Sequence, residues 1–425
     1  MSTLTLPAES GLPARRVVVA GLVGNVLEWY DFGLYGLLAP VLAERFFPGG
    51  DRIAALLSVY GGFAVGFAVR PIGAAAFGHW GDRLGRRFIL GLSIALMGIA
   101  TAAAGVLPTY AVVGVWAPVM LVLTRLFQGF SVGGEFVGSV TYLVEIAPPG
   151  WRGLAGSVAN IGATIGLLLA AGAAALATQG GAWRIPFLLG GILAAVGYML
   201  RRHLPETLPQ LQPLEAARQP AAPLRQAWRE ARRPLLVTIL FTSGYGIVNY
   251  VSMVFLPTFA HEFGQVAEAA ALHVNTAGQA LALLIVPLAG WSSDRFVRRR
   301  TLLVAAFLGE AATAGFAFYW IQSKGLAGLW PAQLALAGLL AVVMGTAPAF
   351  LAEQFGPAYR VSAHAVAFNV GIGLAGGTAP MMALALIGWT HQPMAAAGYM
   401  VCAALLAAVS ALGLADRSRA TLLNS

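Results

Sequence analysis

The chain has 425 residues, of which 58% are hydrophobic and only 10% are charged, and its formal net charge is +9. Soluble domains carry about 25% charged residues, so this composition excludes an ordinary soluble enzyme. The positive charge would suit nucleic acid, but the arginines lie in short segments between apolar stretches, which argues instead for a protein embedded in a lipid bilayer.

Apolar stretches of about 20 residues recur along the chain, and each is long enough to cross about 30 Å of hydrocarbon as a helix. We therefore predict an all-α membrane protein with twelve transmembrane helices. The first stretch contains two acids and is too long for a cleaved signal peptide, so we expect it to be retained. The predicted spans are 17–42, 53–78, 87–106, 118–146, 153–178, 184–200, 235–260, 270–290, 301–321, 329–350, 361–388 and 394–414.

A polar stretch rich in proline, glutamine and arginine divides these spans into two groups of six. We expect an N-terminal six-helix bundle over residues 1–200, a cytoplasmic linker over 201–234 and a C-terminal six-helix bundle over 235–425. Arginines concentrate in the connections on one side of the predicted membrane. The positive-inside rule therefore predicts that both termini are cytoplasmic.

Two short motifs repeat across the linker. Gly78, Asp82, Arg83, Arg86 and Arg87 recur at the same spacing as Gly290, Asp294, Arg295, Arg298 and Arg299. Glu145, Pro149 and Arg152 recur as Glu353, Pro357 and Arg360. Two parallel six-helix repeats are typical of transporters whose binding site lies between the halves near the middle of the membrane.

Several segments carry a family resemblance. Residues 78–87, GHWGDRLGRR, resemble the signature loop after the second helix of the major facilitator superfamily. GNVLEWYDF (24–32), RPIG (70–73), RLFQGFSVGGE (125–135) and WRIPF (183–187) are similar to segments of its metabolite:proton symporters. The resemblance covers essentially the whole chain and implies proton symport. That family includes carriers of proline and betaine, oxoglutarate, citrate and shikimate, so the resemblance implies no single substrate.

Charged residues inside predicted spans are the first site candidates, because a charge at the centre of a membrane helix costs about 2.5–3.5 kcal/mol. Glu28 and Asp31 share one face of the first helix, and the fourth helix carries Arg125 and Glu135. The acids could exchange a proton and the arginine could bind a substrate carboxylate. Alternatively, they could be ion pairs that hold helices together. We predict all four as the proton-coupling and substrate site.

Polar residues beside glycine or proline in the spans are the second group, because broken helices expose their backbone to a cavity. Ordinary hydrogen bonds between helices would explain these residues equally well. The predicted substrate-cavity residues are Asn25, Tyr35, Asn249, Tyr250, Asn369 and Thr378.

The charged loops of the repeat are the third group. Such a cluster could be a topology signal alone, but the family resemblance implies a cytoplasmic gate. In that gate an aspartate binds the N-terminus of a helix in the other half while the cytoplasmic side is closed. The predicted gate residues are Asp82, Arg83, Arg86, Arg87, Asp294, Arg295 and Arg298.

We therefore expect a secondary transporter of the inner cell membrane that works by alternating access. It would couple protons to uptake of a zwitterionic compatible solute such as proline or betaine, or of an organic acid. A passive facilitator or a proton-driven exporter of the same fold is the alternative. No enzymatic activity is expected, because no phosphate loop or nucleophile motif is found.

The expected partners are the small-molecule substrate, the proton and the lipid bilayer. Neither nucleic acid nor an obligate protein partner is predicted. Cys402 is the only cysteine, which leaves no disulfide framework and no cysteine-rich metal site. We therefore expect no metal and no cofactor.

Overall fold

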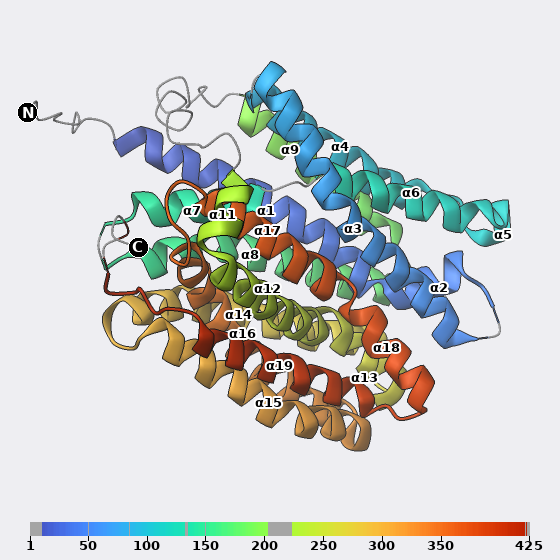
Figure 1. The fold of residues 1–425 in the computed structure, drawn as a ribbon. Helices are drawn as coiled ribbons and strands as arrows, with labels where there is room; N and C mark the ends of the chain where they lie inside the picture. The colour runs from blue at the N-terminus through green and yellow to red at the C-terminus, as the bar shows by residue number, and fades with distance from the viewer. Residues whose placement is uncertain are drawn as a thin grey trace, which may run out of the picture.

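The structure is a computed structural model that describes residues 11–49, 51–84, 86–131, 135–148, 150–202, 223–420 and 422. Within these ranges the secondary structure is helical throughout (Figure 1). Side chains are described over most of the same ranges, but not at 11–21, 74, 75, 77–90, 135, 142, 146, 179, 180, 200–202 or 223.

The first half of the chain, up to residue 202, forms nine helices among the described residues. They are α1 (Gly11–Leu37), α2 (Ala39–Phe46), α3 (Arg52–Leu84), α4 (Arg86–Val106), α5 (Tyr110–Val113), α6 (Trp116–Ser131), α7 (Glu135–Ile146), α8 (Arg152–Gly180) and α9 (Arg184–Arg202). The predicted span 17–42 is divided into α1 and α2. The cause is Pro40, which lacks a backbone N–H and cannot continue the preceding helix.

The second half begins with a short amphipathic helix, α11 (Pro223–Glu230), within the predicted linker, of which residues 203–222 lie outside the described part. The other helices are α12 (Arg232–Tyr250), α13 (Leu256–Gly264), α14 (Glu268–Arg295), α15 (Arg299–Lys324), α16 (Leu326–Ala352), α17 (Arg360–Phe368), α18 (Ala379–Thr390) and α19 (Ala395–Gly413). Two π-helical segments interrupt this series, η1 (Val251–Phe255) and η2 (Asn369–Gly376). They lie where broken helices were expected, directly after Tyr250 and from Asn369 onward.

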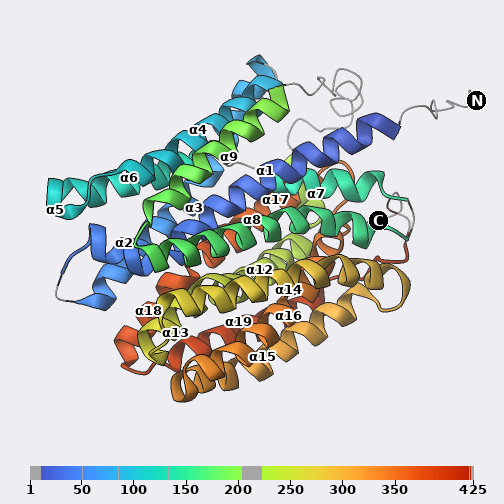
Figure 2. The same cartoon turned by 180° about the vertical axis from the view of Figure 1, so that it is seen from behind.

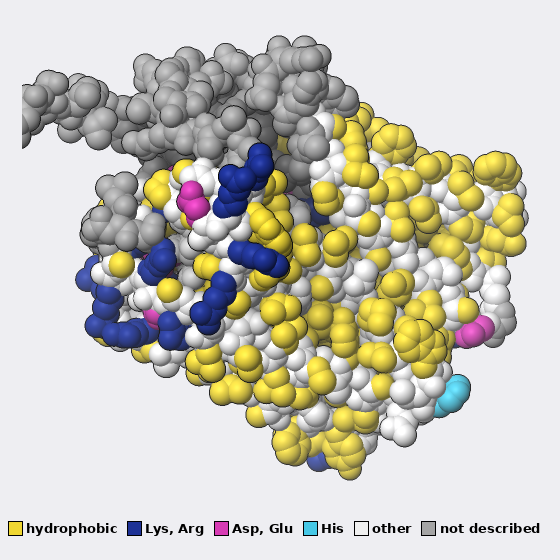
Figure 3. Space-filling model, viewed as in Figure 1, with side chains coloured by type: hydrophobic (Ala, Val, Ile, Leu, Met, Phe, Trp, Pro, Cys, Tyr) yellow, Lys and Arg dark blue, Asp and Glu magenta, His cyan; other side chains and the backbone are white. Residues whose placement is uncertain are grey.

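The outer surface matches a protein solvated by lipid. Eight helices of the described residues are long and apolar enough to cross a membrane. Large apolar side chains such as Ile99, Leu176 and Trp389 are exposed on this surface. Figure 3 shows hydrophobic side chains over most of one face and a concentration of basic side chains at the end where the C-terminus lies. We call this end the arginine-rich end.

The two halves meet along α8 and α14, which lie side by side between the outer helices (Figure 2). Small residues allow this close approach. A Cβ atom at Gly290 would lie 2.8 Å from the carbonyl oxygen of Gly153, which is too close for any side chain. The halves are therefore in backbone contact near the arginine-rich end.

Candidate functional site

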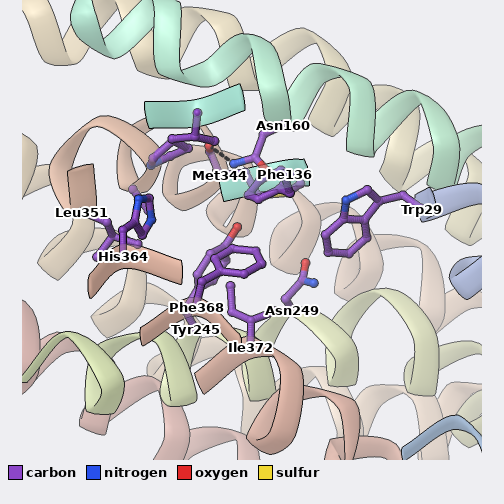
Figure 4. Close-up of a pocket in the computed structure, with 13 residues that line it drawn as sticks. Trp29, Phe136, Asn160, Tyr245, Asn249, Met344, Leu351, His364, Phe368 and Ile372 are labelled. Atoms are coloured by element: carbon purple, nitrogen blue, oxygen red, sulfur yellow. Dashed lines mark hydrogen bonds between the residues drawn. The ribbon is translucent and has the colours of Figure 1, made fainter. Parts of the chain in front are cut away.

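A small cavity lies between the two halves (Figure 4). Its volume of about 20 Å³ is room for roughly one water molecule. The first half contributes Trp29, Phe136, Val140 and Asn160, and the second half contributes Tyr245, Asn249, Met344, Ala347, Pro348, Leu351, His364, Phe368 and Ile372. A metabolite would therefore fit only if the halves moved apart.

Aromatic pairs join the halves at the cavity, and Trp29, Phe136 and Phe368 of these pairs line it. The ring of Phe136 from α7 stacks on Phe368 from α17 with centroids 4.8 Å apart. Trp29 of α1 stacks on Tyr250 of α12 at 6.3 Å. Each pair takes one ring from each half, so a relative movement of the halves would open the wall and enlarge the cavity.

Asp31 lies two residues after Trp29, so the regular turn of α1 directs it away from the cavity and into the first half. One carboxylate oxygen of Asp31 accepts hydrogen bonds from the Thr101 hydroxyl at 2.7 Å and from the Gln128 amide. The same oxygen lies 3.5 Å from Nη2 of Arg125. The second oxygen, Oδ2, is buried and has no hydrogen-bond partner.

Arg125 is buried as deeply as Asp31 but is held mainly by an aromatic ring. Its guanidinium carbon lies 4.2 Å from the centre of the Tyr35 ring. None of its three guanidinium nitrogens makes a hydrogen bond within the described part of the chain. The Asp31–Arg125 pair is therefore an ion pair at long range rather than a pair joined by direct hydrogen bonds.

Glu28 has a closer partner than Asp31. Arg70 of α3 donates a hydrogen bond to its carboxylate, and both side chains are buried. The Arg70 guanidinium also lies 5.1 Å from the ring centres of Phe32 and Phe67. The structure thus brings the two acids of α1 to arginines from different helices. The side chain of Glu135 lies outside the described part.

The predicted substrate-cavity residues lie in different places. Asn249 lines the cavity, and its buried carbonyl oxygen has no hydrogen-bond partner. Tyr250 lies next to the cavity, against Trp29. The other four donate hydrogen bonds to backbone carbonyls: Asn25 to Ala159 at 3.4 Å, Tyr35 to Val59 at 3.1 Å, Asn369 to Ala365 at 2.9 Å and Thr378 to Leu374 at 2.8 Å.

At the arginine-rich end, Asp294 connects the halves. Its carboxylate accepts hydrogen bonds from the backbone N–H groups of Gly153 at 2.8 Å and Leu154 at 2.9 Å, at the start of α8. A carboxylate at a helix N-terminus is favourable because it meets unsatisfied donors and the positive end of the helix dipole. Arg299 also binds Asp294, at 2.6 Å.

The other gate candidates of the second half are more exposed. The Arg295 guanidinium lies 4.9 Å from the ring centre of Trp151, which caps α8. Arg298 precedes α15 and is exposed. The side chains of Asp82, Arg83, Arg86 and Arg87, which form the first-half set, lie outside the described part.

The buried centre of this end was not among the predicted site residues. Arg299 donates to both carboxylate oxygens of Glu353 at 2.6 Å, and Arg152 of the first half lies 2.9 Å from the same carboxylate. Arg299 and Glu353 are completely buried. The repeat of Glu145 and Arg152 as Glu353 and Arg360 was the signal in the sequence that could have identified this cluster.

The opposite end is also closed. Arg52 at the start of α3 binds Glu262 of α13 at 2.8 Å and Glu44 at 3.3 Å. The Tyr60 hydroxyl lies 2.8 Å from the Thr258 hydroxyl, which again joins α3 to α13. With polar contacts between the halves at both ends and a minimal cavity between them, the structure represents an occluded state.

Among the described residues, no group of His, Cys, Asp and Glu side chains is arranged to hold a metal.

Two helical halves that are joined at both ends around a central cavity define a membrane transporter of the alternating-access type. The chain belongs to the major facilitator superfamily, whose profile matches residues 21–380, and within it to the metabolite:proton symporters. This membership confirms the predicted fold class, the predicted family and the expectation of a transporter rather than an enzyme.

The chain is 31% identical to the proline/betaine transporter of Salmonella typhimurium, over 95% of this chain and 83% of that protein. It is 32% identical to the shikimate transporter of Escherichia coli over 98% of each chain. Among solved structures, a D-xylose-proton symporter superimposes with a TM-score of 0.73 at 21% identity, over 93% of this chain and 97% of that one. The last match concerns the fold alone.

Proposed function

We propose that the protein is a proton-coupled symporter that imports a small carboxylate-bearing solute across the inner cell membrane. The arginine-rich end would face the cytoplasm, with both termini on that side, in keeping with the positive-inside rule. A single chain would suffice, because both the cavity and the contacts that close it are formed within one polypeptide.

Asp31 is the observation that carries the proposal. A carboxylate in the interior of a span, with one oxygen unpartnered and an arginine at 3.5 Å, has a position at which a proton can bind. Protonation would remove the counter-ion of Arg125 and so change the packing of α1 against α6. Since α1 also places Trp29 in the cavity wall, such a change would reach the substrate site.

Glu28 supports this choice by contrast. It is hydrogen-bonded to Arg70, and disrupting a buried, hydrogen-bonded ion pair is costly. We therefore assign proton coupling to Asp31 and a structural role to the Glu28–Arg70 pair. A passive facilitator of the same fold would have no need of an acid in the position of Asp31, whereas a proton-driven exporter would differ from a symporter in the direction of solute movement.

The substrate class follows from the relatives and the cavity together. Proline, betaine and shikimate, which the relatives' names specify, all carry a carboxylate. The aromatic rings of Trp29, Tyr250 and Phe368 offer faces that could bind the cationic part of a zwitterion. A zwitterionic solute and an organic acid are both compatible with this lining.

Uptake into proteoliposomes with an imposed pH gradient tests the proposal. Labelled proline, glycine betaine, shikimate, oxoglutarate and citrate would be offered one at a time. A symporter should accumulate one of them above its external concentration when the outside is acidic, and adding that solute should drive proton entry. Asp31→Asn should lose accumulation yet retain exchange of labelled for unlabelled solute. Equilibration without accumulation by the parent protein would identify a facilitator.

A further inference from the structure

His364 is a titratable group that the proposed coupling site does not use. It lies on α17 with only 1% of its surface exposed, one helical turn before Phe368, and it lines the central cavity. Figure 4 shows His364 and Trp29 at opposite ends of this cavity, with Phe136 and Phe368 between them. Among the described residues that line the cavity, His364 alone can carry a positive charge.

The imidazole ring is weakly engaged by the protein. Nδ1 lies 3.5 Å from the hydroxyl oxygen of Thr141 on α7, at the limit of a hydrogen bond. Within the part of the chain that the structure describes, no other hydrogen bond to His364 is found. A buried side chain with this much unused hydrogen-bonding capacity is suited to a ligand that enters the cavity.

Among the side chains that the structure describes, the charged groups nearest His364 are already paired; Glu135, which precedes the cavity residue Phe136, lies outside that part. Arg360, one turn earlier on α17, binds Glu145 of α7 at 2.7 Å. Glu353, just after α16, is bound by Arg299 and Arg152. On α12 and α8 the polar groups that face the cavity are neutral: Tyr245, Asn249 and Asn160.

The remaining neighbour, α11, packs against the far face of α17 through Ala227. Its charged residues Arg225, Arg229 and Glu230 are exposed, and none of them lines the cavity. The arginines inside the first half, Arg70 and Arg125, lie beside Glu28 and Asp31. A carboxylate that enters the cavity therefore finds its cationic partner in His364.

We infer that His364, in its protonated form, binds the carboxylate of the transported solute. An isolated charge in this apolar cavity is costly, whereas an imidazolium and a carboxylate that enter together compensate each other. The proton comes from the solution on the side from which the solute enters, and no covalent bond is made. At the other end, the indole N–H of Trp29 and the carbonyl oxygen of Asn249, both without partners, remain for the rest of the solute.

This inference rests on the proposed function, and transport kinetics can separate the two. Labelled proline, glycine betaine and shikimate would be tested at external pH values of about 6 and about 8, on either side of the usual titration range of histidine. For the solute that the parent protein accumulates, KM should fall as the external pH is lowered. The methyl ester of that solute should compete roughly 10–100-fold more weakly than the acid, the range expected for a hydrogen bond to a charged group.

His364→Gln keeps a polar side chain but cannot become cationic. It should raise KM roughly 10–100-fold, weaken the dependence of KM on pH to the part that Asp31 contributes and reduce the preference for acid over ester. Uphill accumulation at saturating solute should persist, because Asp31 is intact. Met344→Leu, a volume-conserving change in the same cavity, should leave the pH dependence and the acid-over-ester preference unchanged.

A parent protein that accumulates a solute but binds its ester as well as the acid would overturn the role of His364 without any variant. So would a folded His364→Gln protein with the parent's KM and pH dependence. In both cases the proposed symport would stand. A parent protein that accumulates none of the five solutes of the uptake assay would instead contradict the proposed function, and the inference with it.

Discussion

Arg152 and Glu353 form an ion pair 2.9 Å long between the first and second halves, and the internal repeat places a second pair opposite it. Arg360 of the second half binds Glu145 of the first half at 2.7 Å. Because Arg152 corresponds to Arg360 and Glu145 to Glu353 in the repeat, each half supplies the arginine of one pair and the glutamate of the other. The arginine-rich end is therefore closed by two related contacts.

The two pairs should differ in strength, because Glu353 is fully buried while 40% of the Glu145 side chain is exposed. Removing one partner of a buried pair costs about 3–5 kcal/mol, whereas an exposed pair contributes about 0.2–1 kcal/mol. Glu353→Gln should therefore shift the population toward the state that is open at the arginine-rich end by about 100-fold or more. Glu145→Gln should shift it by less than about 10-fold.

Labelling of a single cysteine measures this shift. Cys402 is exposed and is the only cysteine, so Cys402→Ser provides a cysteine-free background for Ala347→Cys in the cavity wall. Labelling from the arginine-rich side should accelerate strongly with Glu353→Gln and weakly with Glu145→Gln. Equal rates for the two variants would contradict the difference that we infer from burial.

At the opposite end of the molecule, removing one ion pair between the halves should shift the population toward the open state by a smaller factor. Arg52 is 32% exposed and Glu262 is 15% exposed, so their pair is partly screened by water. Glu262→Gln should increase labelling of Ala347→Cys from that side by less than about fivefold. Thr258→Val serves as the matched control variant at the same interface, because it removes only the hydrogen-bond partner of the Tyr60 hydroxyl and leaves the Arg52–Glu262 ion pair intact. A large increase from Glu262→Gln alone would show that this single pair dominates closure at this end.

The fold was predictable because its signals are repeated along the chain. Apolar length identified the spans, and the repeat of Asp82 as Asp294 identified the halves. Helix interruptions were expected near Asn249 and Asn369, but the form that they take, two π-helical segments, depends on tertiary packing. The division of the first span after Leu37 could have been predicted from Pro40.

The candidate site was less predictable. The sequence of a membrane-spanning segment indicates which polar residues lie within the membrane, but it does not indicate which neighbouring helix each side chain faces. Glu28 and Asp31 were expected to face a cavity, with ion pairs between helices as the alternative, and in the structure each lies beside an arginine of a different helix. His364 gave no signal, since a single histidine in an apolar stretch has no spacing pattern. Only the packing of α17 against α7 places it in the cavity between the halves.

The C-terminal segment should stay attached to the arginine-rich end at mildly acidic pH. Asp416 accepts hydrogen bonds from the Arg300 N–H at 3.0 Å and from the Ser418 hydroxyl at 2.6 Å. Burial alone would raise the pKa of Asp416, but these hydrogen bonds hold it below its usual value. A group of this kind contributes stability above its unfolded pKa, and that stability is lost only as pH falls through the lower folded pKa.

Limited proteolysis of the C-terminal segment tests this attachment. Relative to a reference peptide substrate, the cleavage rate should be constant from about pH 8 to about pH 5, because Asp416 remains ionised over that range. Asp416→Asn should raise the rate several-fold at every pH in the range. Faster cleavage of the parent protein as pH falls through this range would contradict the depressed pKa.

Asp31 and Glu28 should respond differently to removal of their charge. Asp31→Asn removes the counter-ion of buried Arg125, but that pair is 3.5 Å long and is not joined by a direct hydrogen bond, so we expect a smaller loss of stability than for Glu28→Gln together with complete loss of uphill transport. Glu28→Gln removes the charge of a buried carboxylate that is hydrogen-bonded to Arg70, which should lower the free energy of unfolding by about 3–5 kcal/mol. Thermal unfolding and uptake measured on the same preparations would separate these effects, and an unchanged midpoint for Glu28→Gln would contradict its structural role.

The crossing of α3 and α6 allows a stability test in which two glycines should give opposite results. A Cβ atom at Gly129 of α6 would lie 1.8 Å from the carbonyl oxygen of Gly66 on α3, and backbone cannot move aside there without separating the helices. At Gly315 of α15, by contrast, a Cβ atom would meet no atom within 4 Å. Replacement by alanine should therefore produce a steric clash at Gly129, whereas at Gly315 the added methyl group would touch no other atom.

Gly129→Ala should destabilise the protein by at least about 1–3 kcal/mol, the usual cost of overpacking a close contact. It should also reduce transport, because α6 carries Arg125 and Gln128 to Asp31, and separating α6 from α3 would displace them. Gly315→Ala should raise the thermal midpoint, since alanine favours a helix over glycine by up to about 1 kcal/mol. Thermal unfolding of both variants in one detergent checks the sign of each effect. A higher thermal midpoint for both variants would mean that helix propensity, rather than the approach of α6 to α3, governs Gly129.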